Sequence, residues 1–142
     1  MCFCIPLDWD HLERDAEAHC GETLAQMLSE IDSPKELLED IRSHYAAKYG
    51  EEYPLTTMLR KSLYCVDELT GFIIAVTLVR PSKKLADVEV SSVKKKLKDK
   101  TFAAQVDRAQ IQRCEELLQI GLDELIAITL EAMKPVASEM GL

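Results

Sequence analysis

The stretch TMLRKSLYCVDELTGFIIAVTLVRP, residues Thr57–Pro81, decides the fold that this sequence predicts. It is too long and too apolar for a β-strand, and too short to cross a membrane. We therefore expect it to be the central buried helix of an all-α bundle of six or seven helices. One apolar stripe of this helix carries a carboxylate, Asp67, in its middle. The other members of the stripe are Leu59, Leu63, Thr70, Gly71, Ile74 and Leu78.

Asp67 needs a physical reason to lie in an apolar stripe. Burying an unpaired carboxylate costs on the order of several kcal/mol, so the group must be neutral, hydrogen-bonded, paired with a cation or bound to a metal. A hydrogen bond from a neighbouring helix or turn is the structural explanation, and a metal ion is the functional one. Gly71, one turn later, predicts that another element packs closely against the helix.

Length and charge limit the class of protein. A chain of 142 residues predicts one domain with one core, and a hydrophobic content of 47% excludes a disordered chain. The net charge of −8 argues against binding to long nucleic acids or anionic membranes. The charge is uneven, because eight basic and three acidic residues between Arg80 and Lys100 give that segment +5.

The five cysteines do not predict a secreted disulfide framework. Their number is odd, and the apolar start MCFCIPL has no basic region and reaches Asp8 at once, unlike a signal peptide. Cys2 and Cys4 have no partner at zinc-site spacing, and Cys20 lies on the apolar face of a predicted helix. We expect a reduced, cytoplasmic protein.

Two helices are predicted before the central one. Apolar residues recur with helical spacing over 17–31, and Ser33-Pro34-Lys35-Glu36 then forms a capping box with Ser33 as the N-cap. The helix that it starts is predicted to end at Gly50. Its buried stripe contains Leu37, Leu38, Ile41, His44 and Tyr45.

The C-terminal part is also predicted to be helical. A short basic helix covers about 91–98, and Asp107 caps a helix that Gly121 ends. Asp123 caps the last helix, which Pro135 kinks or shortens.

Three side chains on different predicted helices suggest a metal site: His19, His44 and Asp67. Two imidazoles and a carboxylate suit a borderline divalent ion, and such a site would explain the buried Asp67. The alternative is that His44 is a hydrogen-bonded core residue. His11, among acidic neighbours, fits a solvated loop better than a cation site.

A second candidate site is basic. Arg80, Lys83 and Lys84 follow the central helix, and with Lys94 they could bind substrate phosphates as point charges. A solvated basic helix face is the alternative.

The run YCVDELTGFIIAVTLVRPSKKLADVEVSSVKKKLKDKTFAAQVDR, residues Tyr64–Arg108, resembles the C-terminal half of bacterial HD-domain proteins, the metal-dependent phosphohydrolase superfamily. The resemblance covers about Asp8 to Leu142. It implies a single domain over 1–142: an N-terminal arm (1–14), a remnant of the metal-site half (15–81) and a helical half (82–142) that includes most of the basic segment 80–100. It maps the distant metal-binding Asp of the superfamily onto Asp67, and two intervening His residues onto His19 and His44.

The sequence departs from the superfamily at its start. Ile5-Pro6 stands where the resemblance would put the His-Asp doublet, and the helix that carries the first His is missing. The doublet Asp normally anchors the metal, so its loss should remove most affinity and the metal-bound water. The chain would then be a pseudoenzyme, a chain altered at its start, or a protein that takes ligands from a second copy.

The resemblance implies two functions of different classes. The first is a divalent-metal phosphohydrolase of nucleotides or other phosphoesters, with impaired or no catalysis and no assignable catalytic residue. It would use Mn, Fe, Ni, Zn or Mg and no organic cofactor. The second is a non-catalytic helical module for binding or assembly. Missing N-terminal helices would uncover apolar surface, so we expect a homodimer built at the N-terminal side.

Overall fold

The computed structural model describes residues 20–142, and all regular elements among them are helices, which confirms the all-α prediction. The chain divides into an N-terminal unit, Met1–Thr56, and a C-terminal unit, Thr57–Leu142. Each unit has its own cluster of buried apolar side chains. The predicted arm 1–14 lies outside the described residues, and a single domain over 1–142 stays a prediction. In the described part of the chain, no helix is long and apolar enough to cross a membrane.

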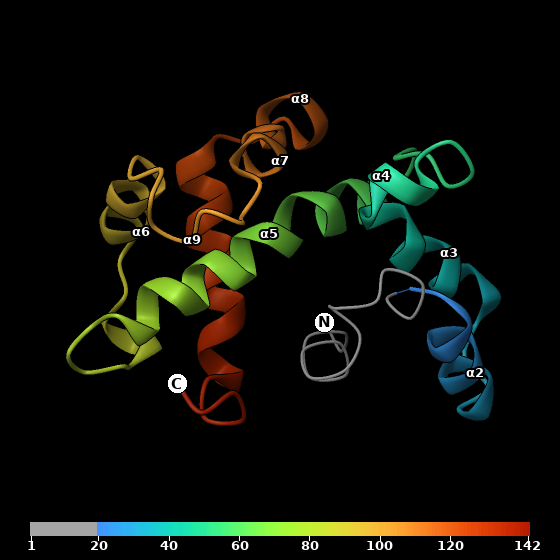
Figure 1. Ribbon diagram of the computed structural model, residues 1–142, viewed down its shortest axis with the longest axis horizontal. Coiled ribbons are helices and arrows are strands. Elements are labelled where there is room, and N and C mark those ends of the chain that lie inside the picture. The colour runs from blue at the N-terminus through green and yellow to red at the C-terminus, as the bar shows by residue number, and fades with distance from the viewer. Residues whose placement is uncertain (1–19) are drawn as a thin grey trace. The chain divides into compact units, whose positions relative to one another are not determined.

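The N-terminal unit contains α2 (Glu22–Glu30), α3 (Lys35–His44) and the short α4 (Ala46–Tyr49), coloured blue to green in Figure 1. Its small core joins the start of α2 to the middle of α3. The buried members of this core are Cys20, Leu24 and Ile41, with Leu28, Leu38 and Tyr49 packed against them.

The capping prediction for Ser33 is wrong. Pro34 occupies the N-cap position of α3 without a side-chain cap, and the Ser33 hydroxyl instead donates to the Leu28 carbonyl at 2.9 Å. The Ser33 side chain points toward the turn after α2 rather than toward the first amides of α3. The predicted single helix up to Gly50 also breaks at Tyr45, between α3 and α4.

The C-terminal unit is organised around α5 (Met58–Leu78), which Thr57 caps by accepting a hydrogen bond from the Arg60 amide at 3.2 Å. Figure 1 shows the long α5 with α9 crossing it and α6, α7 and α8 beside it. The other elements of this unit are η1 (Leu85–Asp87), α6 (Val90–Leu97), α7 (Arg108–Gln112), α8 (Cys114–Leu118), α9 (Leu122–Met133) and η2 (Lys134–Val136).

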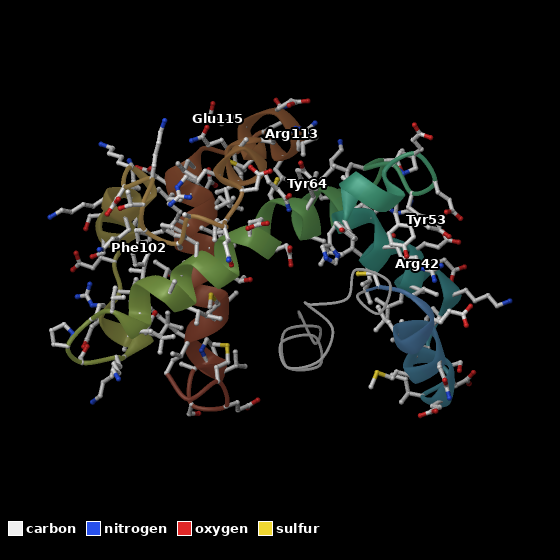
Figure 2. The ribbon with its side chains drawn as sticks, viewed as in Figure 1. Arg42, Tyr53, Tyr64, Phe102, Arg113 and Glu115 are labelled. Atoms are coloured by element: carbon white, nitrogen blue, oxygen red, sulfur yellow. The ribbon has the colours of Figure 1, made fainter. Side chains whose placement is uncertain are left out.

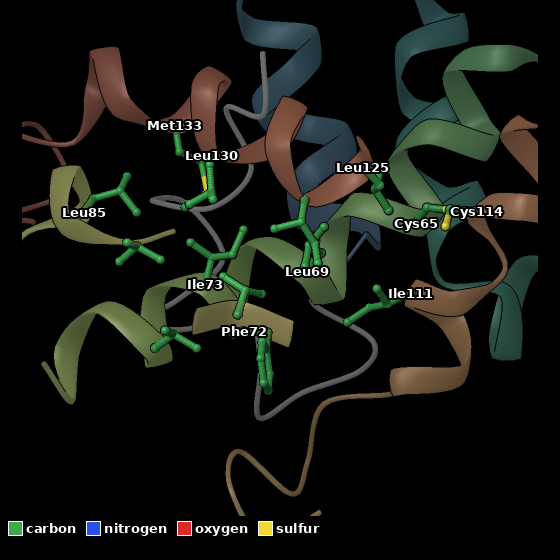
Figure 3. Close-up of a cluster of buried hydrophobic side chains, with 14 residues drawn as sticks. Cys65, Leu69, Phe72, Ile73, Leu85, Ile111, Cys114, Leu125, Leu130 and Met133 are labelled. Carbon is green, nitrogen blue, oxygen red and sulfur yellow. The ribbon is translucent and has the colours of Figure 1, made fainter. Parts of the chain in front are cut away.

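The face of α5 that meets this core is not the predicted one. Figure 3 shows four members of the buried stripe, Cys65, Leu69, Phe72 and Ile73. Val76 is the fifth buried apolar member. The predicted stripe lies roughly on the opposite side of the helix. Its ends, Leu59 and Leu78, are 51% and 50% exposed. A Cβ atom at Gly71 would meet nothing within 4 Å, so the predicted close packing there is wrong for the described residues.

Two further caps have opposite outcomes. Asp107 caps α7 as predicted, because its carboxylate accepts from the amides of Ala109 and Gln110 at 2.9 and 3.2 Å. The prediction for Asp123 is wrong, because Gly121 is the N-cap of α9 and Asp123 lies in its first turn.

The last helix is shortened at Pro135, as predicted. The α-helix α9 ends at Met133, two residues before this proline.

Arg108 at the start of α7 holds the irregular segment 98–107 in place. Its five N–H donors contact five backbone carbonyls, and its guanidinium carbon lies 5.3 Å from the centre of the Phe72 ring. The accepting carbonyls belong to Leu97, Asp99, Phe102, Ala103 and Val106. A single side chain therefore ties the end of the basic helix α6 to the core face of α5.

Candidate metal and phosphate site

The predicted metal ligands fall in different parts of the chain. His19 lies outside the described residues, His44 ends α3 in the N-terminal unit, and Asp67 lies in α5 of the C-terminal unit. A site shared by all three therefore stays a prediction. Within residues 20–142, no three His, Cys, Asp or Glu side chains gather closely enough to hold a metal ion.

His44 has the orientation that a metal-binding imidazole usually has. Its Nδ1 lies within hydrogen-bonding distance of the Ile41 carbonyl, and its Nε2 lies 4.0 Å from the Cys20 sulfur. A carbonyl oxygen only accepts, so Nδ1 is the nitrogen that donates to Ile41, and Nε2 is the nitrogen that faces the Cys20 sulfur. Metal-bound histidines typically donate their other nitrogen to a backbone carbonyl in this way, so the ring fits a metal ligand.

Asp67 lies half-buried near the middle of α5. Its backbone carbonyl accepts a hydrogen bond from the Thr70 hydroxyl at 2.8 Å. Among the described residues, no donor or cation contacts its carboxylate. The structural explanation, a hydrogen bond from a neighbouring element, therefore finds no support in the described part of the chain.

The four basic residues of the predicted phosphate site differ in their surroundings. Lys94 forms an ion pair with Asp123, with 2.6 Å between the nitrogen and the nearer carboxylate oxygen. Arg80 donates to the Ser92 hydroxyl at 3.2 Å and is half-buried. Lys83 and Lys84 are exposed in the segment between α5 and η1. An anion would compete with Asp123 for Lys94, whereas the two exposed lysines are accessible to it.

Cys20 is the neighbour of His44 that the sequence reasoning missed. It was assigned to an apolar helix face, but it precedes α2 and has a left-handed backbone with φ 61°. Its side chain is fully buried, and its carbonyl accepts from the Arg42 Nε at 2.9 Å. No periodic spacing connects positions 20 and 44, so only the folded unit could show this pair.

Cys65 and Cys114 form a second thiol pair, in the core of the C-terminal unit (Figure 3). Burial and, to a smaller extent, the neighbouring Cys114 thiol raise the pKa of the Cys65 thiol to about 11, and Arg113 partly offsets both. Burial also raises the pKa of Cys114. Figure 2 shows Arg113 close to Tyr64, whose ring centre lies 5.4 Å from the guanidinium carbon. These thiols are protonated core residues rather than nucleophiles.

The raised pKa of Cys65 predicts a loss of stability in alkali. The unfolded thiol loses its proton near pH 9.0 and the folded thiol near pH 11, so the unfolded state binds fewer protons between these values. The free energy of unfolding should therefore fall as the pH rises from about 9 to about 11, by about 2–3 kcal/mol from this group. Urea unfolding at stepped pH measures the loss.

Cys65→Ala is the matched control, since it removes this thiol and leaves the lysines that also titrate in alkali. The difference between the parent and the variant should shrink as the pH rises. Parallel pH curves for the two proteins would contradict the prediction.

Comparison of the chain with models of protein families, with curated proteins and with solved structures gives no match.

Proposed function

We propose that this protein is a relative of the HD-domain phosphohydrolases that binds a divalent metal ion and a phosphorylated small molecule, with impaired or no catalysis. The resemblance over Tyr64–Arg108 and the all-helical described part of the chain support this proposal. His44 and Asp67 would hold the metal together with His19. The metal would supply Lewis-acid chemistry toward a phosphate oxygen. A reduced compartment such as the cytoplasm fits Cys65 and Cys114, which lie close together without a disulfide bond.

The observation that carries the proposal is the carboxylate of Asp67. A half-buried carboxylate with no donor or cation around it loses part of its hydration without compensation. A bound cation would compensate this loss by pairing with the carboxylate. A divalent ion is the ligand that the resemblance predicts at this position, and a carboxylate oxygen suits each of the ions Mn, Fe, Ni, Zn and Mg.

The phosphate part of the proposal depends on the segment after α5. Lys83 and Lys84 are exposed, and Arg80 lies close to the start of this segment. Two ammonium groups and a guanidinium can hold a phosphate through charge-assisted hydrogen bonds. Lys94 would join them only after leaving Asp123.

Elemental analysis of the full chain, purified without chelators or an affinity-tag metal and then supplied with Mn²⁺, tests the metal. We expect roughly one ion per chain in the parent, and a loss of most of it in His44→Ala and in Asp67→Asn. Asp87→Asn is the matched control, because Asp87 is an exposed carboxylate at the end of η1 and should leave the metal content unchanged. A metal-free parent would refute the proposal.

One observation favours the second candidate, a non-catalytic assembly module. Three apolar side chains near the ends of α5 are strongly exposed: Met58 at 64%, Leu59 at 51% and Leu78 at 50%. Contiguous exposed apolar side chains are typical of association surfaces, and Met58 and Leu59 are neighbours at the start of α5. We propose that they contribute to a homodimer, through a surface on the C-terminal unit rather than at the N-terminal side where the sequence predicts it.

Light scattering at micromolar concentration tests the homodimer. We expect the mass of a dimer for the parent, and a monomer for Leu59→Glu combined with Leu78→Glu. Ile128→Glu is the control, because Ile128 is 54% exposed but lies on α9 of the same unit, away from the ends of α5. A monomeric parent would rule out the dimer.

A further inference from the structure

The segment 78–84 at the end of α5 forms an exposed tip with apolar and cationic side chains. Leu78 and Val79 are 50% and 57% exposed, and Lys83 and Lys84 follow as exposed cations. Figure 1 shows this tip, coloured yellow-green, at one end of the C-terminal unit. An apolar pair and two ammonium groups therefore share one short exposed stretch of the chain.

Hydrogen bonds hold the tip in place. The Arg80 amide donates to the Thr77 carbonyl at 3.1 Å, and the Lys83 amide donates to the Arg80 carbonyl at 3.2 Å. The Arg80 guanidinium donates to the Ser92 hydroxyl at 3.2 Å, which ties the tip to the first turn of α6. The apolar pair therefore stays exposed unless a partner covers it.

Helix α6 extends the basic surface beyond the tip. Lys95 lies one turn after Ser92, on the side of α6 to which Arg80 is tied, and it is exposed. Within residues 20–142, no carboxylate forms an ion pair with Lys83, Lys84 or Lys95. Three lysine ammonium groups are therefore available to an external anion.

The side-chain types favour an anionic lipid surface over an acidic protein segment as that anion. Recognition of a particular phosphate or carboxylate in a protein typically uses the planar, bidentate guanidinium, whereas lysine acts as a point charge. Seven of the eight basic residues between Arg80 and Lys100 are lysines. Clustered lysines next to exposed apolar side chains are typical of proteins that lie on anionic membranes.

The net charge of −8 does not exclude this contact. At physiological salt, exposed charges farther apart than about 8 Å are largely screened, so the charge close to the contact decides the attraction. The stretch 69–86 contains no acidic residue, and the segment from Arg80 to Lys100 carries +5. The local charge therefore outweighs the net charge, on which the expectation of no membrane binding depends.

We infer that the tip 78–84, together with Lys95, is a docking surface for an anionic phospholipid membrane. Leu78 and Val79 enter the boundary between headgroups and acyl chains, and the lysines contact the lipid phosphates. The inference rests on the phosphate part of the proposed function and deepens it, because the phosphate belongs to a lipid headgroup. It needs neither the metal ion nor Asp67.

Flotation of the full chain with vesicles, in a buffer that contains a chelator, tests the inference. The vesicles consist of phosphatidylcholine with or without roughly one third of phosphatidylserine. We expect the parent to bind the anionic vesicles at least roughly tenfold more tightly than the neutral ones. Lys83→Gln combined with Lys84→Gln should weaken this binding at least roughly tenfold. Val79→Ser should weaken it roughly threefold or more.

Two matched controls should bind the anionic vesicles as the parent does. Lys35→Gln combined with Lys61→Gln removes the same charge at the start of α3 and near the start of α5. Ile128→Ser removes a similarly exposed apolar side chain from α9. Val79 rather than Leu78 tests the apolar pair, because Leu78 also belongs to the proposed homodimer surface. Circular dichroism checks that each variant is folded.

Four outcomes overturn the inference. A parent that does not bind the anionic vesicles does so, and it leaves an acidic protein segment as the alternative occupant. Equal losses in the Lys83, Lys84 variant and in its lysine control show that net charge, rather than the tip, attracts the lipid. A Val79→Ser variant that binds like the parent shows that the apolar pair does not enter the membrane.

The fourth outcome separates a lipid phosphate from a soluble one. Complete release of the parent by inorganic phosphate, beyond the effect of chloride at the same ionic strength, would show that the lysines bind soluble phosphate instead. That result overturns the inference and leaves the proposed function intact. The chelator keeps metal ions out of the flotation experiment, so the elemental analysis with Mn²⁺ decides the metal part of the proposed function separately.

Discussion

Replacing Phe72 with alanine is expected to lower the free energy of unfolding by about 3–5 kcal/mol. The side chain is fully buried between α5 and the rest of the C-terminal core. Its ring meets Phe102 edge to face, with the centroids 5.5 Å apart, and carries the Arg108 guanidinium on its face. The substitution leaves a large cavity and removes both ring contacts. Urea unfolding of the full chain, followed by circular dichroism, measures the loss.

Ile128→Ala is the matched control in the same unit, because Ile128 is 54% exposed and lies on α9 outside the buried core. We expect a change within about 0.5 kcal/mol for it. A loss for Phe72→Ala below about 1 kcal/mol, or equal losses for both variants, would mean that the core face of α5 is assigned wrongly.

The sequence predicted where α5 lies but not which side of it faces the core. The helix was expected over Thr57–Pro81 and is observed over Met58–Leu78. Its apolar residues are distributed around the whole circumference, so helical periodicity could not choose between two faces. The predicted buried face is the one with Asp67, whereas the opposite face is buried in the C-terminal unit. Helix type and length follow from local pattern, but orientation depends on partners far away in the chain.

The caps show the same limit at the level of single hydrogen bonds. Ser33 and Asp107 both fit an N-cap pattern, yet only Asp107 caps its helix. Gln110, three residues after Asp107, stands where a capping box has its second side chain, but it donates to the Tyr64 carbonyl and does not bind the Asp107 amide. Glu68 of α5 accepts from that amide instead, at 3.0 Å. Contacts with α5 thus satisfy the Asp107 amide and the Gln110 side chain, which would bind each other in a capping box.

The candidate site could be predicted only as a set of residue types. Two imidazoles and a carboxylate indicated a metal, but the thiol beside His44 was not expected, since Cys20 and His44 are connected only through the packing of α2 on α3. Asp67 was predicted as a metal ligand because it lies in the predicted buried stripe of α5, but the stripe that is buried lies on the opposite side of the helix. Asp67 is nevertheless half-buried, and its carboxylate has no partner among the described residues. The proposal that it binds a metal now depends on that missing partner.

Replacing Arg108 with alanine is expected to destabilise the C-terminal unit by about 3 kcal/mol or more. The substitution removes hydrogen bonds to five carbonyls of the segment 97–106 and the contact with Phe72. Charge-assisted hydrogen bonds each contribute roughly 1.5–3 kcal/mol, although some of the carbonyls regain water when the segment loosens. The guanidinium is the one side chain with five donors in a planar arrangement, so Arg108→Lys should recover only a minor part of the loss.

Arg113→Ala is the matched control for Arg108, since Arg113 is another partly exposed arginine with an aromatic neighbour. Its guanidinium pairs with Glu116 at 3.2 Å within one helical turn, an exposed ion pair of a kind that contributes about 0.2–1 kcal/mol. Urea unfolding should therefore separate the two variants by about 2 kcal/mol or more. Native-state hydrogen exchange should also show faster exchange of the Phe102 and Val106 amides in Arg108→Ala, since both belong to turns that the guanidinium holds. An equal loss of stability in Arg108→Ala and Arg113→Ala would show that the positive charge, rather than the hydrogen bonds to the carbonyls, stabilises the unit. An Arg108→Lys variant as stable as the parent would exclude a role for the planar guanidinium.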